Sequence, residues 1–182
     1  QGVVFDPERF FEEVQTLRSR GVRIEGRLFI SRRAHVVFPY HKALDSLRER
    51  NAGDKKIGTT SLGIGPAYSD KSARLGIRLC DLTDSATFSA LLAQNLKEKN
   101  ALIREVYKGR GFSFKRLHQR YADYGKRLTP FLCDCGEVVR DALKKGKKVL
   151  FEGAQGTLLD IDNGTYPFVT SSSTGVDGIA SG

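Results

Sequence analysis

One stretch near the end of the chain restricts the possible folds more than any other. An apolar run, Lys147–Phe151 (KKVLF), is followed at once by glycines, amides and hydroxyls. A short apolar run bounded by turn residues is typical of a buried strand in a parallel α/β sheet. Ligands of such sheets bind beyond the carboxyl ends of the strands. The sequence therefore predicts an α/β protein with a binding loop after this strand.

The loop after the predicted strand contains the groups that a nucleotide site needs. Gln155 stands near glycines on both sides, so a flat ring can approach the backbone there. Its carboxamide places an acceptor beside a donor, which matches the N1–H and O6 edge of hypoxanthine or guanine. The hydroxyl run Thr170–Thr174 can bind phosphate without carrying charge. A strand edge with a serine-rich turn is the alternative, and the pattern alone does not decide between the two.

A second glycine-rich stretch, residues 57–74 (IGTTSLGIGPAYSDKSAR), is a candidate phosphate cradle. Its glycines let backbone amides turn toward an anion, and Thr60 offers a hydroxyl donor. Lys71 and Arg74 add positive charge on a following helical turn. The stretch is neither a Walker A loop nor a GxGxxG motif. An ordinary glycine-rich turn is the alternative reading, and such turns are more common.

The rest of the chain predicts helices around short strands. Capping residues and helical spacing predict helices that start after Asp6, at Pro39 and after Asp84. Short strands are expected within Arg27–Ser31 and His35–Phe38, a loop over 58–68, and a helix restarted at Pro130 and ended by Gly146. We expect one incomplete domain over 1–182, divided into an α/β segment with the phosphate loop (1–80), a helical subdomain (81–146) and a strand with binding loops (147–182).

Composition limits the classes of function. The 182 residues carry a formal charge of +9, which attracts nucleic acid, anionic lipid or phosphorylated small molecules. The basic residues are dispersed along the sequence, which argues weakly against a single groove for a polyanion. No apolar run is long enough to span a membrane. Cys80, Cys133 and Cys135 are an odd set whose spacing suits neither a relaxed disulfide nor zinc, so we expect reduced thiols in a cytosolic protein.

The histidines and paired acids provide no clear catalytic group. His35 and His41 lack a third ligand at metal spacing, so a structural role is expected for both. Asp45 follows His41 by one helical turn and could pair with it on one helix face. Two further acids, at 160 and 162, would point in opposite directions in an extended segment and do not form an acid/base pair.

Three stretches together resemble one known family, adenylosuccinate synthetase. They are RLFIS…AHVVFPYHKALD, IGTTSLGIGPAYSDKSAR and VLFEGAQGTLLDIDNGTYPFVTSS, in that order, and the resemblance covers essentially the whole chain. In length the chain resembles only a central part of that enzyme, and it opens with Gln1-Gly2 and lacks methionine, so we expect an internal fragment. The resemblance implies a mostly parallel sheet related to the P-loop nucleotide-binding proteins, with a helical subdomain. It also implies a homodimeric, cytoplasmic ligase of AMP biosynthesis, which joins IMP to L-aspartate with GTP and Mg²⁺ by way of 6-phosphoryl-IMP.

The resemblance also assigns roles to four positions. Thr60 would contact the IMP phosphate, Arg74 would reach that phosphate from the other subunit, Gln155 would read the ring, and Thr170 would hold the phosphate from the opposite side. The family's catalytic aspartate and histidine, its Mg²⁺ ligands and its loops for aspartate and guanine match nothing in this chain. No catalytic, cofactor-binding or metal-binding residue is therefore assigned, and the isolated chain is expected to be inactive. Leu62 and Leu75 stand where the family often has arginine.

Two other classes of function remain as alternatives. A basic nucleic-acid-binding module without catalysis would show an affinity that falls steeply with salt concentration. A non-catalytic interaction domain that merely keeps the fold would not bind IMP. A titration with IMP would separate this last class from the first hypothesis.

Overall fold

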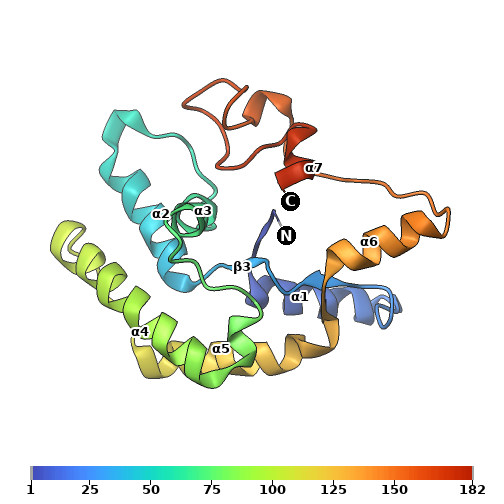
Figure 1. Cartoon of the computed structure of the whole chain (residues 1–182). Helices are drawn as coiled ribbons and strands as arrows, with labels where there is room; N and C mark the ends of the chain where they lie inside the picture. Colours follow the sequence, from blue (N-terminus) through green and yellow to red (C-terminus); the bar gives the residue numbers. More distant parts are fainter. Residues whose placement is uncertain (1, 182) are drawn as a thin grey trace.

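The computed structural model describes residues 2–181 as a mixed α/β fold dominated by helices (Figure 1). The α-helices are α1 (Pro7–Ser19), α2 (Pro39–Asn51), α3 (Ile64–Ser72), α4 (Ser85–Ala101), α5 (Phe114–Leu128), α6 (Cys135–Lys144) and α7 (Asp177–Ser181). The strands are β1 (Val4–Phe5), β2 (Ile30–Ser31), β3 (His35–Val36) and β4 (Leu132–Cys133). Short 3-10 segments are η1 (Gly53–Lys55), η2 (Asp81–Thr83), η4 (Thr129–Phe131) and η5 (Thr157–Leu159), and η3 (Leu102–Val106) is a π-helix. Within the described range, no helix is both long and apolar enough to cross a bilayer.

The strands form two separate parallel pairs. β1 pairs with β3, with Val4 opposite His35, and β2 pairs with β4, with Ile30 opposite Leu132. An antiparallel bridge from His35 to Arg78 extends the first pair. Parallel pairing confirms the predicted α/β class, since α1 forms part of the crossover that parallel strands require. The predicted strands around residues 27–38 are shorter than expected, at two residues each.

The hydrophobic core lies where β3 leads into α2 and meets α4 and α5. Phe38 is fully buried, and its ring centroid lies 4.3 Å from that of Tyr121 and 5.2 Å from that of Tyr40. The Tyr121 hydroxyl donates a 3.1 Å hydrogen bond to the Val37 carbonyl, which satisfies both groups inside the core. The stacked rings and this bond fix α5 against the start of α2.

The predicted helix starts at the front of the chain are confirmed. Asp6 caps α1 by accepting a 3.0 Å hydrogen bond from the Glu8 amide, and Asp84 caps α4 by accepting a 2.6 Å bond from the Thr87 amide. α2 begins at Pro39, where proline suits the first helical position because it lacks an amide donor. Local capping chemistry is therefore sufficient to place these helices.

Two predicted boundaries are wrong. Pro130 does not restart a helix; it lies in η4, and the chain then forms β4 before α6 begins. α6 starts where the Asp134 carboxylate accepts a hydrogen bond from the Glu137 amide, because that aspartate is the next available N-cap. The loop predicted to run to residue 68 ends at Gly63, where a left-handed N-cap opens α3.

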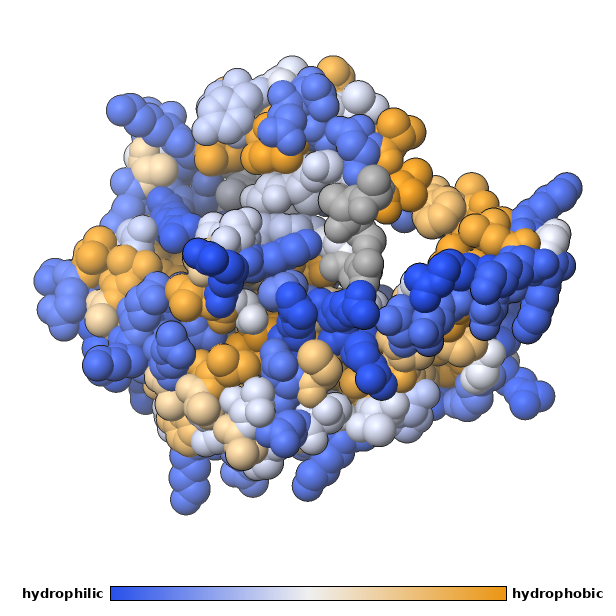
Figure 2. Space-filling model, in the orientation of Figure 1, coloured by the Kyte–Doolittle hydropathy of each residue, from blue (hydrophilic) through white to orange (hydrophobic). Residues whose placement is uncertain are grey.

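The buried strand predicted at Lys147–Phe151 is also absent. This segment has no assigned secondary structure, Leu150 is 88% exposed and Phe151 is 52% exposed. It runs as an extended ribbon from α6 to the loops beside α7, and apolar side chains gather on the surface along that path (Figures 1 and 2). Among the described residues no strand pairs with it, so it has neither a hydrogen-bonded ladder nor a covering layer.

Candidate functional site

The candidate phosphate loop is held at both ends by carboxylates of α2. Glu49 accepts hydrogen bonds from the amides of Ile57 and Gly58, both at 3.1 Å. Asp45, one helical turn earlier, accepts a 2.9 Å bond from the amide of Gly63. Residues four apart lie on the same face of a helix, so the two acids form a pair of anchors along α2. The hydroxyl-bearing residues between the anchors are displayed on the surface.

Gly63 has two reasons to be glycine. Its φ of +77° lies in the left-handed region that side chains disfavour. A Cβ at this position would also lie 2.6 Å from the Lys42 amide nitrogen and 2.8 Å from the His41 carbonyl carbon. The backbone at Gly63 therefore touches that of α2 directly, and α3 begins at this contact.

Behind the loop, a buried charge network joins α2, α3 and α4. His41 Nδ1 accepts a 3.0 Å hydrogen bond from the Phe38 amide, so Nε2 carries the proton and donates to Asp70 at 3.0 Å. The other Asp70 oxygen lies 2.6 Å from Lys99 Nζ. The pairing of His41 with Asp45 that the sequence spacing allowed is not found, because Asp45 binds the loop amide instead. The expected structural role of His41 agrees with its full set of hydrogen bonds.

The pKa shifts follow from burial and from these hydrogen bonds. Burial opposes ionisation of Asp70, but hydrogen bonds from His41 and then Lys99 outweigh it and hold the pKa of this carboxyl below its usual value. Burial lowers the pKa of His41 more than the hydrogen bond to Asp70 raises it, which favours the neutral imidazole. The network therefore contains one buried ion pair, Asp70 with Lys99, and a neutral histidine that donates to it.

The second candidate loop folds around a single buried carboxylate. Asp160 is 1% exposed, and its oxygens accept hydrogen bonds from four backbone amides, those of Asp162 (3.0 Å), Asn163 (2.9 Å), Thr174 (2.6 Å) and Gly175 (3.3 Å). These amide donors hold the pKa of Asp160 far below its usual range. Asp160 therefore organises the loop as an anion, and the expectation that it does not form an acid/base pair with Asp162 agrees with this role.

Asp160 brings the hydroxyl run back over the loop that contains Gln155. The Thr174 hydroxyl donates a 2.9 Å hydrogen bond to the Gly156 carbonyl, and the Thr170 amide donates a 2.8 Å bond to the Leu159 carbonyl. Gln155 is exposed at a φ of +63°. Among the described residues, its carboxamide has no hydrogen-bond partner. The amide is therefore available to a ligand beside the hydroxyl run.

The two loops meet at the start of α3. A Cβ on Gly65 would lie 3.1 Å from the Ser171 hydroxyl, so the second residue of α3 packs against the hydroxyl run. One turn later, the Tyr68 hydroxyl interacts with the Ser172 side chain and donates a 2.7 Å hydrogen bond to the Gly2 carbonyl. In Figure 1 the loops near α7 lie beside α3 accordingly.

The four predicted site residues are all accessible, but they are not in mutual contact. Thr60, Arg74 and Gln155 are exposed, and Thr170 is half-buried. Within residues 2–181, no hydrogen bond joins any of these side chains to another. Arg74 lies just beyond the end of α3 at a φ of +63°. The structure thus brings together the two loop regions but not the four side chains.

Comparison with known proteins shows the family to which the chain belongs. The sequence profile described as adenylosuccinate synthetase matches residues 1–182. The chain belongs to the adenylosuccinate synthetase family. It is 54% identical over 171 residues to the adenylosuccinate synthetase of Carboxydothermus hydrogenoformans and 51% identical over 182 residues to that of Clostridium botulinum, covering 94% and 100% of this chain. It spans only 40% and 42% of the length of these relatives.

The fold is of the adenylosuccinate synthetase type as well. The structure of fully ligated adenylosuccinate synthetase from Plasmodium falciparum matches 98% of this chain with a TM-score of 0.86 at 34% identity. The match covers 41% of that chain, in agreement with the share seen for the sequence relatives. The resemblance stated from the sequence motifs is confirmed, and so is the expected fold class.

Sequence reasoning missed the residues that anchor the two loops. Asp45 and Glu49 were detectable as acids one turn apart on the helix that precedes the glycine-rich loop. Asp160 precedes an Asn-Gly pair, a composition typical of turns in which aspartate accepts nearby amides. Asp70 and Lys99 gave no such signal, because their pairing joins positions far apart in sequence.

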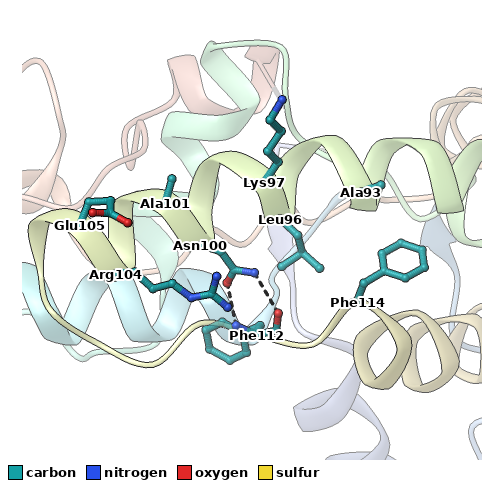
Figure 3. Close-up of a pocket in the computed structure, with 9 residues that line it drawn as sticks. All are labelled: Ala93, Leu96, Lys97, Asn100, Ala101, Arg104, Glu105, Phe112 and Phe114. Atoms are coloured by element: carbon teal, nitrogen blue, oxygen red, sulfur yellow. Dashed lines mark hydrogen bonds between the residues drawn. The ribbon is translucent and has the colours of Figure 1, made fainter.

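Two cavities lie away from these loops. One, of about 370 Å³, lies between α4, η3 and the segment that leads into α5 (Figure 3). On its wall, the Asn100 side chain holds both the amide and the carbonyl of Phe112, at 2.6 and 2.9 Å. A broader groove of about 990 Å³ follows α5 and is lined by several basic residues. Neither contains Thr60, Arg74, Gln155 or Thr170.

Proposed function

We propose that this chain supplies the IMP-binding part of a homodimeric, cytoplasmic enzyme of AMP biosynthesis. The enzyme would join IMP to L-aspartate with hydrolysis of GTP, giving adenylosuccinate, GDP and phosphate. One observation carries the proposal: two independently anchored loops meet at α3 and display polar groups of the kinds that a purine nucleotide needs, and the Gln155 carboxamide among them has no hydrogen-bond partner within residues 2–181. Membership of the adenylosuccinate synthetase family supports the same assignment.

Within this site, one neutral group would bind the purine ring and two others would bind the phosphate. The Gln155 carboxamide would accept from N1–H and donate to O6 of the hypoxanthine ring. The hydroxyls of Thr60 and Thr170 would donate to the phosphate from opposite sides. Because both loops are held by buried carboxylates, their hydroxyls are positioned before the ligand arrives, which reduces the entropy lost on binding.

Arg74 would supply the positive charge. It is exposed, it follows α3 directly, and among the described residues its guanidinium has no ion-pair partner. We propose that it reaches the phosphate of IMP bound by a second copy, so that the site is complete only in the homodimer. A guanidinium can bind a phosphate through two parallel hydrogen bonds, which gives direction as well as charge.

Among the described residues, the acidic side chains do not fit a role in holding Mg²⁺. Within residues 2–181, no group of three or more His, Cys, Asp and Glu side chains is arranged to hold a metal ion. The buried acids of the site are already bound to backbone amides or to Lys99. We therefore assign no Mg²⁺ ligand to the described residues.

Titration with IMP tests the proposal. We expect Gln155→Ala to weaken IMP binding about threefold to tenfold, the effect of one neutral hydrogen bond. Arg74→Ala removes a charged hydrogen bond and should weaken binding about tenfold to a hundredfold. Gln119→Ala, which truncates an exposed glutamine on α5, is the control and should leave the affinity unchanged. Equal affinity of Gln155→Ala and the unmodified protein would contradict the proposal.

A further inference from the structure

The turn that contains Arg74 is held by bonds from two helices. The carbonyl of Asp70, near the end of α3, accepts hydrogen bonds from the amides of Leu75 (2.9 Å) and Gly76 (3.0 Å). From α4, the Asn95 side chain donates a 2.9 Å hydrogen bond to the Leu75 carbonyl. Both backbone polar groups of Leu75 are thus bound, and Arg74 lies immediately before it.

The two helices are in turn joined to each other by buried charge. The Asp70 carboxylate is bound by Lys99 Nζ at 2.6 Å and by His41 Nε2 at 3.0 Å, and Asp70 and Lys99 are 4% and 6% exposed. Asn95 is 3% exposed and lies one helical turn before Lys99. One face of α4 therefore binds both the helix that precedes the turn and the turn itself.

The turn also has little room to relax on its inner side. A Cβ on Gly76 would collide with the imidazole ring of His35, so this glycine lies flat against a buried side chain. His35 is 7% exposed and belongs to β3, in the small parallel sheet. The turn is thus confined by α3, α4 and β3 together.

Such a scaffold holds Arg74 in a backbone conformation that it would not adopt freely. A non-glycine residue with φ near +63° is disfavoured and persists only where the surrounding structure fixes it. Inside the described part of the chain the exposed Arg74 side chain forms no ion pair that would compensate for this conformation. The hydrogen bonds that close the end of α3 fix it instead: the Leu75 amide binds the Asp70 carbonyl and the Arg74 amide binds the Lys71 carbonyl, which is a Schellman-type cap with Arg74 at the left-handed position. The cap thereby restricts the direction in which the Arg74 side chain leaves the helix.

We propose that Asn95 and the Asp70–Lys99 pair are positioning residues, which aim the Arg74 guanidinium toward the IMP phosphate held by the second copy. The inference rests on the proposed function, because it requires that Arg74 binds that phosphate. It assigns to α4, a helix that contains none of the four predicted site residues, a part in nucleotide binding. Asn95 and Lys99 would act through Arg74 without touching the ligand.

Kinetics of the full-length synthetase that contains this chain test the proposal. Asn95→Ala should raise the KM for IMP about threefold to tenfold with little change in kcat, since it weakens binding and transition state alike. In an Arg74→Ala background, Asn95→Ala should raise the KM no further, because the residue that it positions is already gone.

Asn100→Ala is the matched control. Asn100 lies on the same helix and also donates a 2.9 Å amide hydrogen bond to a backbone carbonyl, that of Phe112 (Figure 3). Both alanine variants should lower the melting temperature, but only Asn95→Ala should raise the KM for IMP. The KM therefore separates positioning from a general loss of stability.

The outcomes distinguish the two proposals. If Arg74→Ala leaves the KM for IMP unchanged, both the role of Arg74 and its positioning by α4 are wrong. If Arg74→Ala raises the KM but Asn95→Ala does not, the positioning alone is wrong and the proposed function stands. The positioning is likewise wrong if Asn95→Ala and Arg74→Ala raise the KM additively, or if Asn100→Ala raises it as much as Asn95→Ala does.

Discussion

The Gly63 amide donates a 2.9 Å hydrogen bond to the Asp45 carboxylate, and both residues are buried. This bond joins the end of the candidate phosphate loop to the middle of α2. It also occupies the acid that sequence spacing would have paired with His41, which leaves that histidine free to bind Asp70. Asp45 therefore anchors the loop, whereas His41 belongs to the buried charge network with Asp70.

Asp45→Ala should lower the free energy of unfolding by about 1–3 kcal/mol, because the buried Gly63 amide loses its acceptor. Asp45→Asn retains an acceptor oxygen at the same place and should cost less. Urea unfolding followed by circular dichroism measures both variants. Equal losses for the two would show that the charge of Asp45, and not its acceptor oxygen, stabilises the loop.

Gly63→Ala should destabilise the protein more than Gly58→Ala does. Both glycines have a positive φ, +77° and +82°, so both substitutions carry the same kind of backbone strain. Only at position 63 would the new methyl group meet the α2 backbone; around Gly58 nothing lies within 4 Å. We expect a difference of about 1–3 kcal/mol in the free energy of unfolding, measured in urea. A difference near zero would contradict the close contact with α2.

The free energy of unfolding should fall as the pH falls from 7 to 5. Burial lowers the pKa of both His35 and His41 in the folded protein, and Arg78 adds to the effect at His35. Below about pH 6.5 the unfolded chain therefore binds more protons than the folded one, which favours unfolding by up to ~1.4 kcal/mol per pH unit for each histidine. The lowered pKa of Asp70 acts only nearer pH 4 and below, outside this window.

Denaturation at several pH values checks this expectation. His35→Gln should make the decline between pH 7 and 5 shallower, and the double substitution with His41→Gln should remove most of it. The comparison concerns slopes, so a uniform loss of stability in either variant does not affect it. A decline that is unchanged in the double variant would show that other groups carry it.

Much of the fold could be predicted because helix starts depend on neighbouring residues. Asp6, Pro39 and Asp84 each act within one helical turn, and each predicted start is found in the structure. The strand predicted at Lys147–Phe151 is absent for the opposite reason. An apolar run becomes a strand only beside a partner strand, and none lies there among the described residues. The sequence pattern of a segment indicates its tendency to form a strand, but it does not show whether a partner strand lies beside it.

The candidate site divides in the same way. The types of its ligand-facing groups, such as the Gln155 carboxamide and the Thr170 hydroxyl, could be named from composition and local pattern. The groups that fix them could not, because Asp70 meets Lys99, and Asp45 meets Gly63, across long separations in sequence. A local sequence pattern does not show which distant residue will form a hydrogen bond with a given side chain.

The three cysteines are free thiols, as predicted, and two of them are in contact. The sulfur atoms of Cys133 and Cys135 lie 3.7 Å apart, and burial together with this contact raises the pKa of Cys135 to about 11.

At pH 8 little thiolate is present, so alkylation of Cys135 by iodoacetamide should be slow and should accelerate about tenfold per pH unit up to pH 10. Cys133→Ala removes the contact, lowers the pKa of Cys135 and should speed its alkylation at pH 8, measured by mass spectrometry of the peptide. Cys80→Ala is the control and should leave that rate unchanged; a Cys135 rate that does not respond to Cys133→Ala would mean that burial alone raises its pKa.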